Sequence, residues 1–179
     1  MRNDQEVVPY SLLSMDDKFP QRKRLRLKEF DYSNNFYYFV TICIDNREEF
    51  FSEINKGKSI LTKAGRIVEE IWRNLPKHYP CELDRFIIMP DHIHGILILD
   101  NQYVNTQKKS LSTIIQRFKT FTSRKINELL DGSAKFHWQK SFYDRIIRNE
   151  RELYQIRKYI ELNPLNWELE KDLPENLNL

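Results

Sequence analysis

The stretch CELDRFIIMPDHIHGILIL, residues 81–99, decides the fold because it has the character of two strands joined by a tight turn. Residues 81–89 and 92–99 are each of strand length and rich in Ile and Leu, and a Pro-Asp pair separates them. So short a connection predicts that the two strands pair antiparallel. Gly95, inside the second strand, predicts a bulge or a close backbone approach at that point.

Two further segments predict extended structure. Residues 36–44, FYYFVTICI, are aromatic and β-branched, which is typical of a buried strand. The polar residues 45–58 that follow predict a loop, with a short extra strand around Phe50 and Phe51. Residues 136–148, FHWQKSFYDRIIR, mix aromatic and basic residues and predict short extended pieces.

Three segments have apolar residues at helical spacing. Helices are predicted at about 64–75 and at 111–130, each followed by residues that end helices. A third helix is predicted to start after Asn149, which with Glu152 resembles a capping box, and to end before Pro164. Strand, helix, hairpin, helix and C-terminal helix together predict an α+β fold, with helices packed on one antiparallel sheet.

The length and composition predict one folded domain with arms. We expect a flexible N-terminal arm over residues 1–20, a folded domain over 21–165 and a C-terminal tail over 166–179. No stretch has the length of a signal peptide core or of a membrane span, so no membrane contact is expected. Cys43 and Cys81 are expected to be buried and free, which favours the reducing cytoplasm.

Basic residues are unevenly placed although the net charge is only +3. Residues 21–28 carry five cations and no acid, and two further basic sets follow within residues 108–125 and 145–148. Such clusters suit a polyanion. Each of them is equally typical of an ordinary solvated protein surface.

His92 and His94 stand two residues apart in a predicted strand. They therefore project from the same face, roughly 6.5 Å apart along the backbone, and can converge on one cation. Two partly buried histidines satisfied by backbone carbonyls or by Asp91 are the alternative. A catalytic metal site also needs a third ligand and an open position for substrate.

Tyr159 and Asn163 lie four residues apart on the C-terminal helix, so they share one face of it. That face adjoins the apolar stripe of Leu153, Ile156 and Ile160, at the boundary between core and solvent. A phenol there can be rigid and still accessible. A tyrosine that only packs its ring, and an asparagine that only ends the helix, fit the same spacing.

Taken together, MPDHIHGILIL, the basic amphipathic helix, FHWQKSFYDRIIR and RKYIELNP resemble the single-tyrosine HUH transposases of the IS200 type. The likeness covers about residues 30–165 and is greatest to the REP-associated tyrosine transposase branch. The family's His-hydrophobic-His motif falls on His92, Ile93 and His94, and its nucleophile falls on Tyr159. In the insertion-sequence branch, Gln at the position four after the tyrosine completes the metal site; here it is Asn163, as in the REP-associated branch.

This resemblance implies a ferredoxin-like sandwich: a central antiparallel sheet with helices packed on one face, and a C-terminal helix that bears the tyrosine. It implies cleavage and rejoining of single-stranded DNA near a REP-like hairpin, by a monomer or a homodimer. A divalent metal, Mg²⁺ or Mn²⁺, held by His92, His94 and Asn163, would assist attack by Tyr159, which would form a 5′-phosphotyrosine.

The basic segments would then follow the DNA backbone, and Trp138 would stack on unpaired bases. The candidate contacts are Arg22, Lys23, Arg24, Arg26, Arg117, Lys119, Arg124, Trp138, Arg145 and Arg148. Two other readings stay open. The chain could be a domesticated protein that binds hairpin DNA without cleaving it, or a hydrolase in which water attacks instead of Tyr159.

Overall fold

The computed structural model describes residues 31, 34–100, 109–132 and 134–171. The chain divides into two units, residues 1–30 and 31–179, and every element described below belongs to the second. The expected arm and the first four candidate DNA contacts, which are Arg22, Lys23, Arg24 and Arg26, lie outside the described residues. Within the described part, no helix is both long and apolar enough to cross a membrane.

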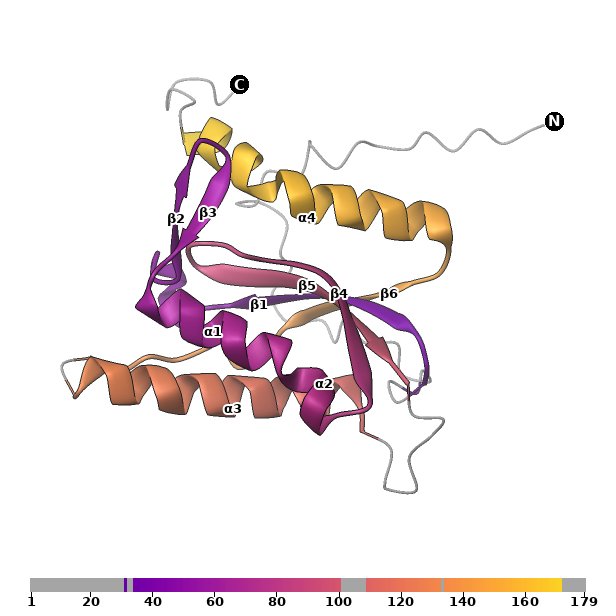
Figure 1. The fold of residues 1–179 in the computed structure, drawn as a ribbon, viewed down its shortest axis with the longest axis horizontal. Helices are drawn as coiled ribbons and strands as arrows, with labels where there is room; N and C mark the ends of the chain where they lie inside the picture. The colour runs from indigo at the N-terminus through magenta and orange to yellow at the C-terminus, as the bar shows by residue number, and fades with distance from the viewer. Residues whose placement is uncertain (1–30, 32–33, 101–108, 133, 172–179) are drawn as a thin grey trace. The chain divides into compact units, whose positions relative to one another are not determined.

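A four-stranded antiparallel sheet forms the centre of this unit (Figure 1). Its strands are β1 (Tyr37–Cys43), β4 (Cys81–Ile88), β5 (His92–Leu99) and β6 (Tyr143–Ile147), in the order β4-β5-β1-β6. The predicted hairpin is confirmed, because β4 pairs antiparallel with β5. With one helix after β1 and another after β5, the chain runs β-α-β-β-α-β, which is the ferredoxin-like order.

Helices cover both faces of the sheet (Figure 1). Helices α1 (Lys63–Arg73) and α3 (Leu111–Leu130) lie on one face, and α4 (Glu150–Lys171) lies on the other; α2 (Leu75–His78) is a short turn after α1. The predicted cap of α4 is confirmed: the side-chain oxygen of Asn149 accepts a hydrogen bond from the Glu152 N–H at 2.9 Å. This cap satisfies a backbone donor that the first helical turn leaves without a partner.

The close approach expected at Gly95 occurs on the face covered by α1. A Cβ atom at Gly95 would lie 2.4 Å from Cζ2 of Trp72, so the indole occupies the space that a side chain would fill. Trp72 in turn packs edge-on against Phe118 of α3, with ring centroids 5.2 Å apart. The bulge lies on the neighbouring strand, between Leu83 and Phe86. Gly95 therefore allows α1 to pack directly on β5.

The loop after β1 contains more structure than its polar composition predicts. A single turn of 3-10 helix, η2 (Asp45–Arg47), follows β1, and the strands β2 (Ser52–Asn55) and β3 (Lys58–Leu61) form a separate hairpin. One strand near Phe50 and Phe51 was the expectation, and the hairpin begins directly after these residues. The strands β2 and β3 are polar and too short to show a clear alternation of polar and apolar residues in the sequence.

The prediction that the C-terminal helix ends before Pro164 is wrong, because α4 continues to Lys171 with Pro164 inside it. The tail expected from residue 166 therefore begins within the helix. Proline inside a helix costs about 3 kcal/mol, and tertiary contacts offset this cost. Glu168 accepts hydrogen bonds from the backbone N–H groups of Lys56 and Gly57 at 2.9 and 2.7 Å.

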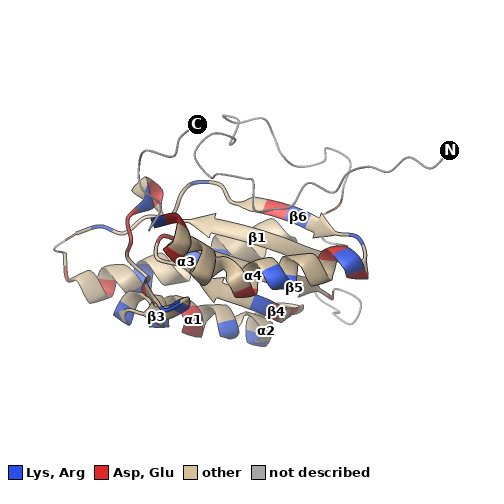
Figure 2. Ribbon diagram, turned by 90° about the horizontal axis from the view of Figure 1, so that it is seen from above, with Lys and Arg blue, Asp and Glu red and all other residues tan. Residues whose placement is uncertain are grey.

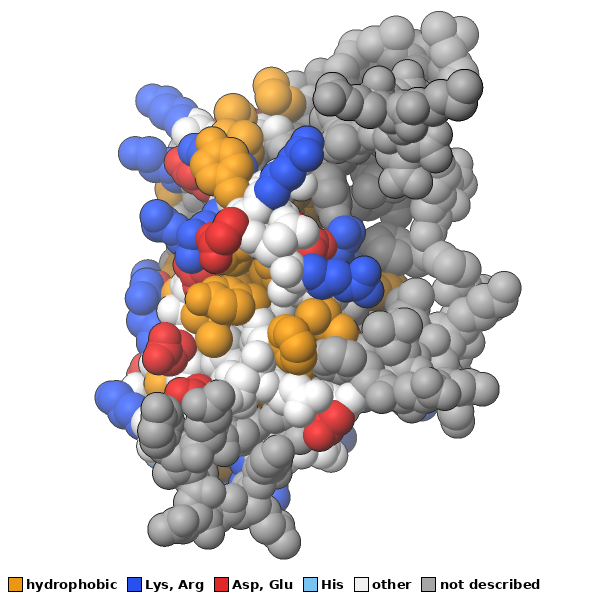
Figure 3. All heavy atoms as spheres, turned by 90° about the vertical axis from the view of Figure 1, so that its right-hand side faces the viewer, with side chains coloured by type: hydrophobic (Ala, Val, Ile, Leu, Met, Phe, Trp, Pro, Cys, Tyr) orange, Lys and Arg blue, Asp and Glu red, His pale blue; other side chains and the backbone are white. Residues whose placement is uncertain are grey.

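Charged side chains of both signs are distributed along the described helices and strands (Figure 2). On the face shown in Figure 3, lysine and arginine side chains alternate with acidic and hydrophobic ones, and those described form no continuous basic field. Charge alone therefore does not locate a nucleic-acid surface, and the local geometry of the histidine pair has to do so.

Candidate active site

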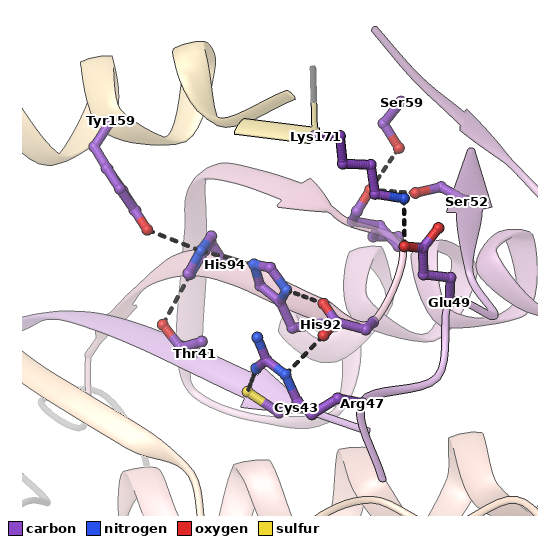
Figure 4. Close-up of polar contacts among 12 residues, drawn as sticks. Thr41, Cys43, Arg47, Glu49, Ser52, Ser59, His92, His94, Tyr159 and Lys171 are labelled. Carbon is purple, nitrogen blue, oxygen red and sulfur yellow. Dashed lines mark hydrogen bonds and ion pairs between the residues drawn. The ribbon is translucent and has the colours of Figure 1, made fainter. Parts of the chain in front are cut away.

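The histidine pair begins β5, on the face of the sheet that α4 covers. His92 and His94 are almost fully buried, and their Nε2 atoms lie 2.9 Å apart. Tyr159, extending from α4, and Thr41, on β1, both point toward His94 (Figure 4). The two imidazoles project together as the strand period predicts, while Gly95 faces α1.

Each imidazole is held at its Nδ1 atom. The carboxylate of Asp91 lies 2.5 Å from Nδ1 of His92, and the hydroxyl of Thr41 lies 2.8 Å from Nδ1 of His94. A carboxylate only accepts, so Asp91 keeps the proton of His92 on Nδ1 and leaves a lone pair on Nε2. When Thr41 likewise accepts from His94, both Nε2 lone pairs point into the same space, as metal-binding histidines require.

The spacing of these nitrogens fits one divalent cation. A cation about 2.1 Å from two ligands at right angles holds them roughly 3 Å apart, and the two Nε2 atoms are 2.9 Å apart. The described residues contain no cluster of three His, Cys, Asp or Glu side chains that could hold a metal. A further protein ligand among these residues would therefore be of another type, and an amide oxygen is one such group.

Burial disfavours the charged form of both imidazoles. It lowers the pKa of His92, and the nearby charge of Asp91 only partly opposes this effect. Burial also lowers the pKa of His94 well below its ordinary value, and the neighbouring His92 and Arg47 lower it further. Because a histidine must lose its proton to bind a metal, these directions favour the ligand form at neutral pH.

Tyr159 reaches the histidine pair from α4, and Asn163 lies on the same helix. The Tyr159 hydroxyl lies 3.2 Å from Nε2 of His94, and its ring packs edge-on against Phe39 with centroids 6.0 Å apart. Asn163, one turn further along the helix, is 8% exposed. Its side-chain amide makes no hydrogen bond with the described residues. The structure thus places the phenol of Tyr159 beside His94, with Asn163 buried one helical turn further along.

Comparison with known proteins identifies the family of this chain. The sequence profile of the family described as "Transposase IS200 like" matches residues 32–163. The chain belongs to this family. An uncharacterized Haemophilus influenzae protein is 34% identical over 167 residues, which cover 82% of this chain and 90% of that protein. A second protein from this organism, named as a candidate REP-associated tyrosine transposase, is 25% identical over 151 residues and 80% of each chain.

A solved structure also resembles this IS200-like transposase. It is that of a REP-associated tyrosine transposase bound to a REP hairpin, and it matches with a TM-score of 0.59 and 18% identity. The match covers 80% of this chain and 74% of that one. At this identity the likeness shows the fold, and with the named relative it supports the resemblance to the REP-associated branch.

Arg47 supports the histidine pair, and sequence reasoning missed it. Nε of Arg47 lies 2.7 Å from the carboxylate of Asp91, and its Nη1 donates to the sulfur of Cys43 at 3.0 Å. Asn46 and Arg47 both have positive φ, of 64° and 57°. Such backbone is costly outside glycine and accumulates at functional sites. The guanidinium therefore compensates the buried carboxylate that orients His92.

Trp167 is a second residue that the sequence did not reveal as part of the site. Its ring centroid lies 5.9 Å from that of His92. It belongs to the part of α4 beyond Pro164, which had been expected to be a tail. The repeat of four residues from Tyr159 through Asn163 to Trp167 could have signalled this position, once the helix was allowed to continue.

The candidate DNA contacts on α3 do not lie beside the histidines. Arg117, Lys119 and Arg124 belong to the helix on the opposite face of the sheet (Figure 1). Nζ of Lys119 donates to the backbone carbonyls of Gln139 and Ser141 at 2.8 and 2.6 Å, which fixes a loop. Arg124 pairs with Glu128 at the surface. Any DNA contact of these residues therefore belongs to a surface away from the histidine pair.

Trp138 does not fit the expected role in base stacking. Its side chain is 8% exposed, its indole N–H donates to Thr122 at 2.8 Å, and its ring packs against Phe51 and Phe118. These contacts place Trp138 in the core beneath α3. Its polar neighbours His137, Gln139 and Lys140 concealed this burial in the sequence.

Arg145 lies on the histidine side of the sheet. Arg145 faces Phe39 across the β1–β6 ladder, so it projects from the histidine face of the sheet, and it pairs with Glu152 at 2.6 Å. Arg148 is exposed just before α4. Of these two arginines, strand pairing places Arg145 on the same side of the sheet as Tyr159.

Proposed function

We propose that this chain cleaves and rejoins single-stranded DNA with Tyr159 as the nucleophile. The observation that carries the proposal is the 3.2 Å separation between the Tyr159 hydroxyl and Nε2 of His94. That nitrogen also faces Nε2 of His92, so the phenol adjoins a pair of neutral imidazoles. All three residues belong to one chain, so a monomer contains the whole proposed centre.

His92, His94 and Asn163 would hold a divalent cation, Mg²⁺ or Mn²⁺. When bound, such a cation polarises a phosphate and stabilises the negative charge that develops on it. Asp91 and Thr41 hold the two rings in the orientation that this binding needs. Asn163 offers a carbonyl oxygen, a ligand that both cations accept.

The proposed reaction exchanges one phosphate ester for another. The oxygen of Tyr159 attacks the scissile phosphorus, a bond forms between them, and the bond from phosphorus to the 3′ oxygen breaks. The phenol gives up its proton to solvent, and the departing 3′ oxygen takes one up. The 5′ end stays on Tyr159 as an ester, so a second 3′-hydroxyl can reverse the exchange and rejoin strands without ATP.

The proposed substrate is a single strand that carries a hairpin. Family membership and the fold shared with a REP-associated transposase bound to a REP hairpin support this substrate class. Arg145 supplies a cation on the Tyr159 side of the sheet, and Arg148 supplies an exposed one just before α4. Cations of this kind contact the phosphate backbone without reading its sequence.

A labelled strand with a REP-like hairpin tests the proposal. Incubated with the protein and Mn²⁺ or Mg²⁺, it should give a covalent protein–DNA adduct. Tyr159→Phe should abolish the adduct and leave DNA binding unchanged. Tyr154→Phe is the matched control, because Tyr154 lies on the same helix and is 62% exposed; it should form adduct as the unmodified protein does.

Two results would favour other functions. Cleavage that persists in Tyr159→Phe would indicate a hydrolase in which water attacks. Hairpin binding with no cleavage in either metal would indicate a domesticated binding protein.

A further inference from the structure

A row of functional side chains continues along α4 beyond the proposed nucleophile. Tyr159, Asn163, Trp167 and Lys171 follow each other at intervals of four residues, so they lie along one side of the helix. Tyr159 contacts His94, and Trp167 lies beside His92. The row therefore runs past both members of the histidine pair and ends on a cation.

The end of this row is anchored to the β2–β3 hairpin. The carboxylate of Glu168 accepts from the N–H groups of Lys56 and Gly57, which form the tip of that hairpin. Lys171 pairs with Glu49, in the segment that leads into β2 (Figure 4). Trp167 directly precedes Glu168 in the helix, so these two contacts hold it in a fixed place beside the site.

Trp167 differs from the other two tryptophans of the chain. Trp72 is fully buried, and Trp138 is 8% exposed with its N–H bonded to Thr122. Trp167 is only partly buried. Nζ of Lys171 lies 5.5 Å from its ring centroid, and the Lys171 side chain is 54% exposed. Because the lysine that lies over this ring is itself exposed, the ring face beneath it is directed toward the protein surface.

We propose that Trp167 is a stacking platform for the unpaired nucleobase next to the scissile phosphate, and that Lys171 binds a phosphate of the same strand. The proposal rests on the function proposed above. A base would replace Lys171 over the indole, and Lys171 would exchange Glu49 for a phosphate. Both partners of that ion pair are about half exposed, so the exchange costs little.

The chemistry of this side of α4 selects a single strand over a duplex. A duplex keeps its bases stacked on each other, whereas an unpaired base offers a free face to an aromatic ring. Stacking is tolerant of sequence because every base has such a face. Trp167 would thus hold whichever base flanks the cut, and its place beside His92 would align the next phosphate with Tyr159.

Tryptophan fluorescence gives the first test. A hairpin with a single-stranded flank is titrated in Mg²⁺ into protein carrying Tyr159→Phe, which prevents cleavage. Trp72 and Trp138 are buried, so stacking on Trp167 should quench the emission, and adding Trp167→Phe should remove the quench. A blunt hairpin without the flank should not quench. An unchanged quench in Trp167→Phe, or none in its parent, would overturn the proposal.

Affinity gives the second test. Trp167→Ala should weaken binding of the flanked hairpin about 5- to 150-fold, which corresponds to about 1–3 kcal/mol for one stacked base. Trp167→Phe, which keeps an aromatic ring, should restore part of this loss. Leu169→Ala is the matched control, because Leu169 is 56% exposed on the same helix; it should bind as the unmodified protein does.

An abasic nucleotide beside the cut separates stacking from a general effect on the fold. On that strand Trp167→Ala should cost nothing further, because the base that it would stack on is absent. If Trp167→Ala binds all strands normally, or cleaves faster, Trp167 is a cover over the site and the platform is wrong. If quench and affinity behave as expected but no adduct forms, the nuclease function fails while the platform stands.

Discussion

The two faces of the central sheet carry side chains of opposite character on the same strand. Toward α1 and α3, β5 presents Ile93, Gly95 and Leu97, and the indole of Trp72 fills the space above Gly95. Toward α4, it presents His92 and His94, whose buried nitrogens contact Asp91, Thr41 and Tyr159. At the start of β5, one face is closed by apolar packing and the other buries polar atoms directed at one another. Further along β5, the α4 face also packs an apolar cluster that includes Ile96, Ile156 and Ile160.

This contrast shows where the chain departs from the most stable packing. Burying polar groups costs free energy unless they find partners, and when both rings carry their proton on Nδ1 the two Nε2 lone pairs face each other and are poor partners. Such an arrangement is expected where function requires it, as at a metal site. Substitutions of the buried polar residues on the α4 face should therefore impair the reaction, and substitutions on the α1 face should impair folding.

The largest effect is expected at His94. His94→Gln keeps a side chain of similar size but replaces the imidazole. We expect DNA cleavage to become about 10³-fold slower. This loss is larger than the loss expected for a residue that only orients a metal ligand. Single-turnover assays in Mn²⁺ measure the rate, and thermal unfolding should show a domain still folded. Cleavage within about tenfold of the unmodified rate would contradict a ligand role.

Gly95→Ala tests the opposite face. The added methyl would lie 2.4 Å from the Trp72 ring, so backbone or helix must move, and we expect a loss of about 3 kcal/mol in the free energy of unfolding. Chemical denaturation measures it. Adding Trp72→Phe, a smaller ring, should return part of the loss. A fully additive double variant would show that the ring and Gly95 do not conflict.

Arg47→Gln tests the support of the histidine pair. Without the guanidinium, Asp91 is an uncompensated buried carboxylate beside His92, and we expect Mn²⁺ to bind about 10–100-fold more weakly. Calorimetric titration without DNA measures this affinity. Arg66→Gln is the control on α1, and it should not change the Mn²⁺ affinity. Equal Mn²⁺ affinities of the two variants would show that Arg47 does not support metal binding.

The smallest effect is expected at the helix caps. Asn149→Ala removes the cap of α4, and Ser110→Ala removes that of α3, where the hydroxyl accepts from Thr113. Each should lower the free energy of unfolding by about 1 kcal/mol. Only Asn149→Ala should also slow cleavage, because α4 carries Tyr159. If both caps slow cleavage equally, the two faces are not functionally distinct.

Local signals explain what the sequence predicted correctly. The 81–99 hairpin follows from two apolar runs around a Pro-Asp turn, and α3 spans residues 111–130 as expected because an apolar stripe and an end signal coincide. Alternation along β5 placed His92 and His94 together, and a spacing of four placed Tyr159 beside Asn163. Each of these depends on neighbours within one element.

Long-range contacts explain what could not be predicted. Helix α4 passes through Pro164 because Glu168 and the β2–β3 hairpin hold its end, and no local pattern carries that information. Arg47 reaches Asp91 from a turn with left-handed backbone, across a gap of 44 residues in sequence. Trp138 is buried although its neighbours are polar. In each case the partner lies in another element.

Peptide mapping of the covalent adduct tests the catalytic role of the histidine face most directly. After reaction with a hairpin strand in Mn²⁺ and protease digestion, mass spectrometry should find nucleotide attached to the peptide that contains Tyr159. Chelation of the metal, or His94→Gln, should remove it. Nucleotide attached to any of the chain's other tyrosines, or adduct that forms equally well in chelator, would contradict that role.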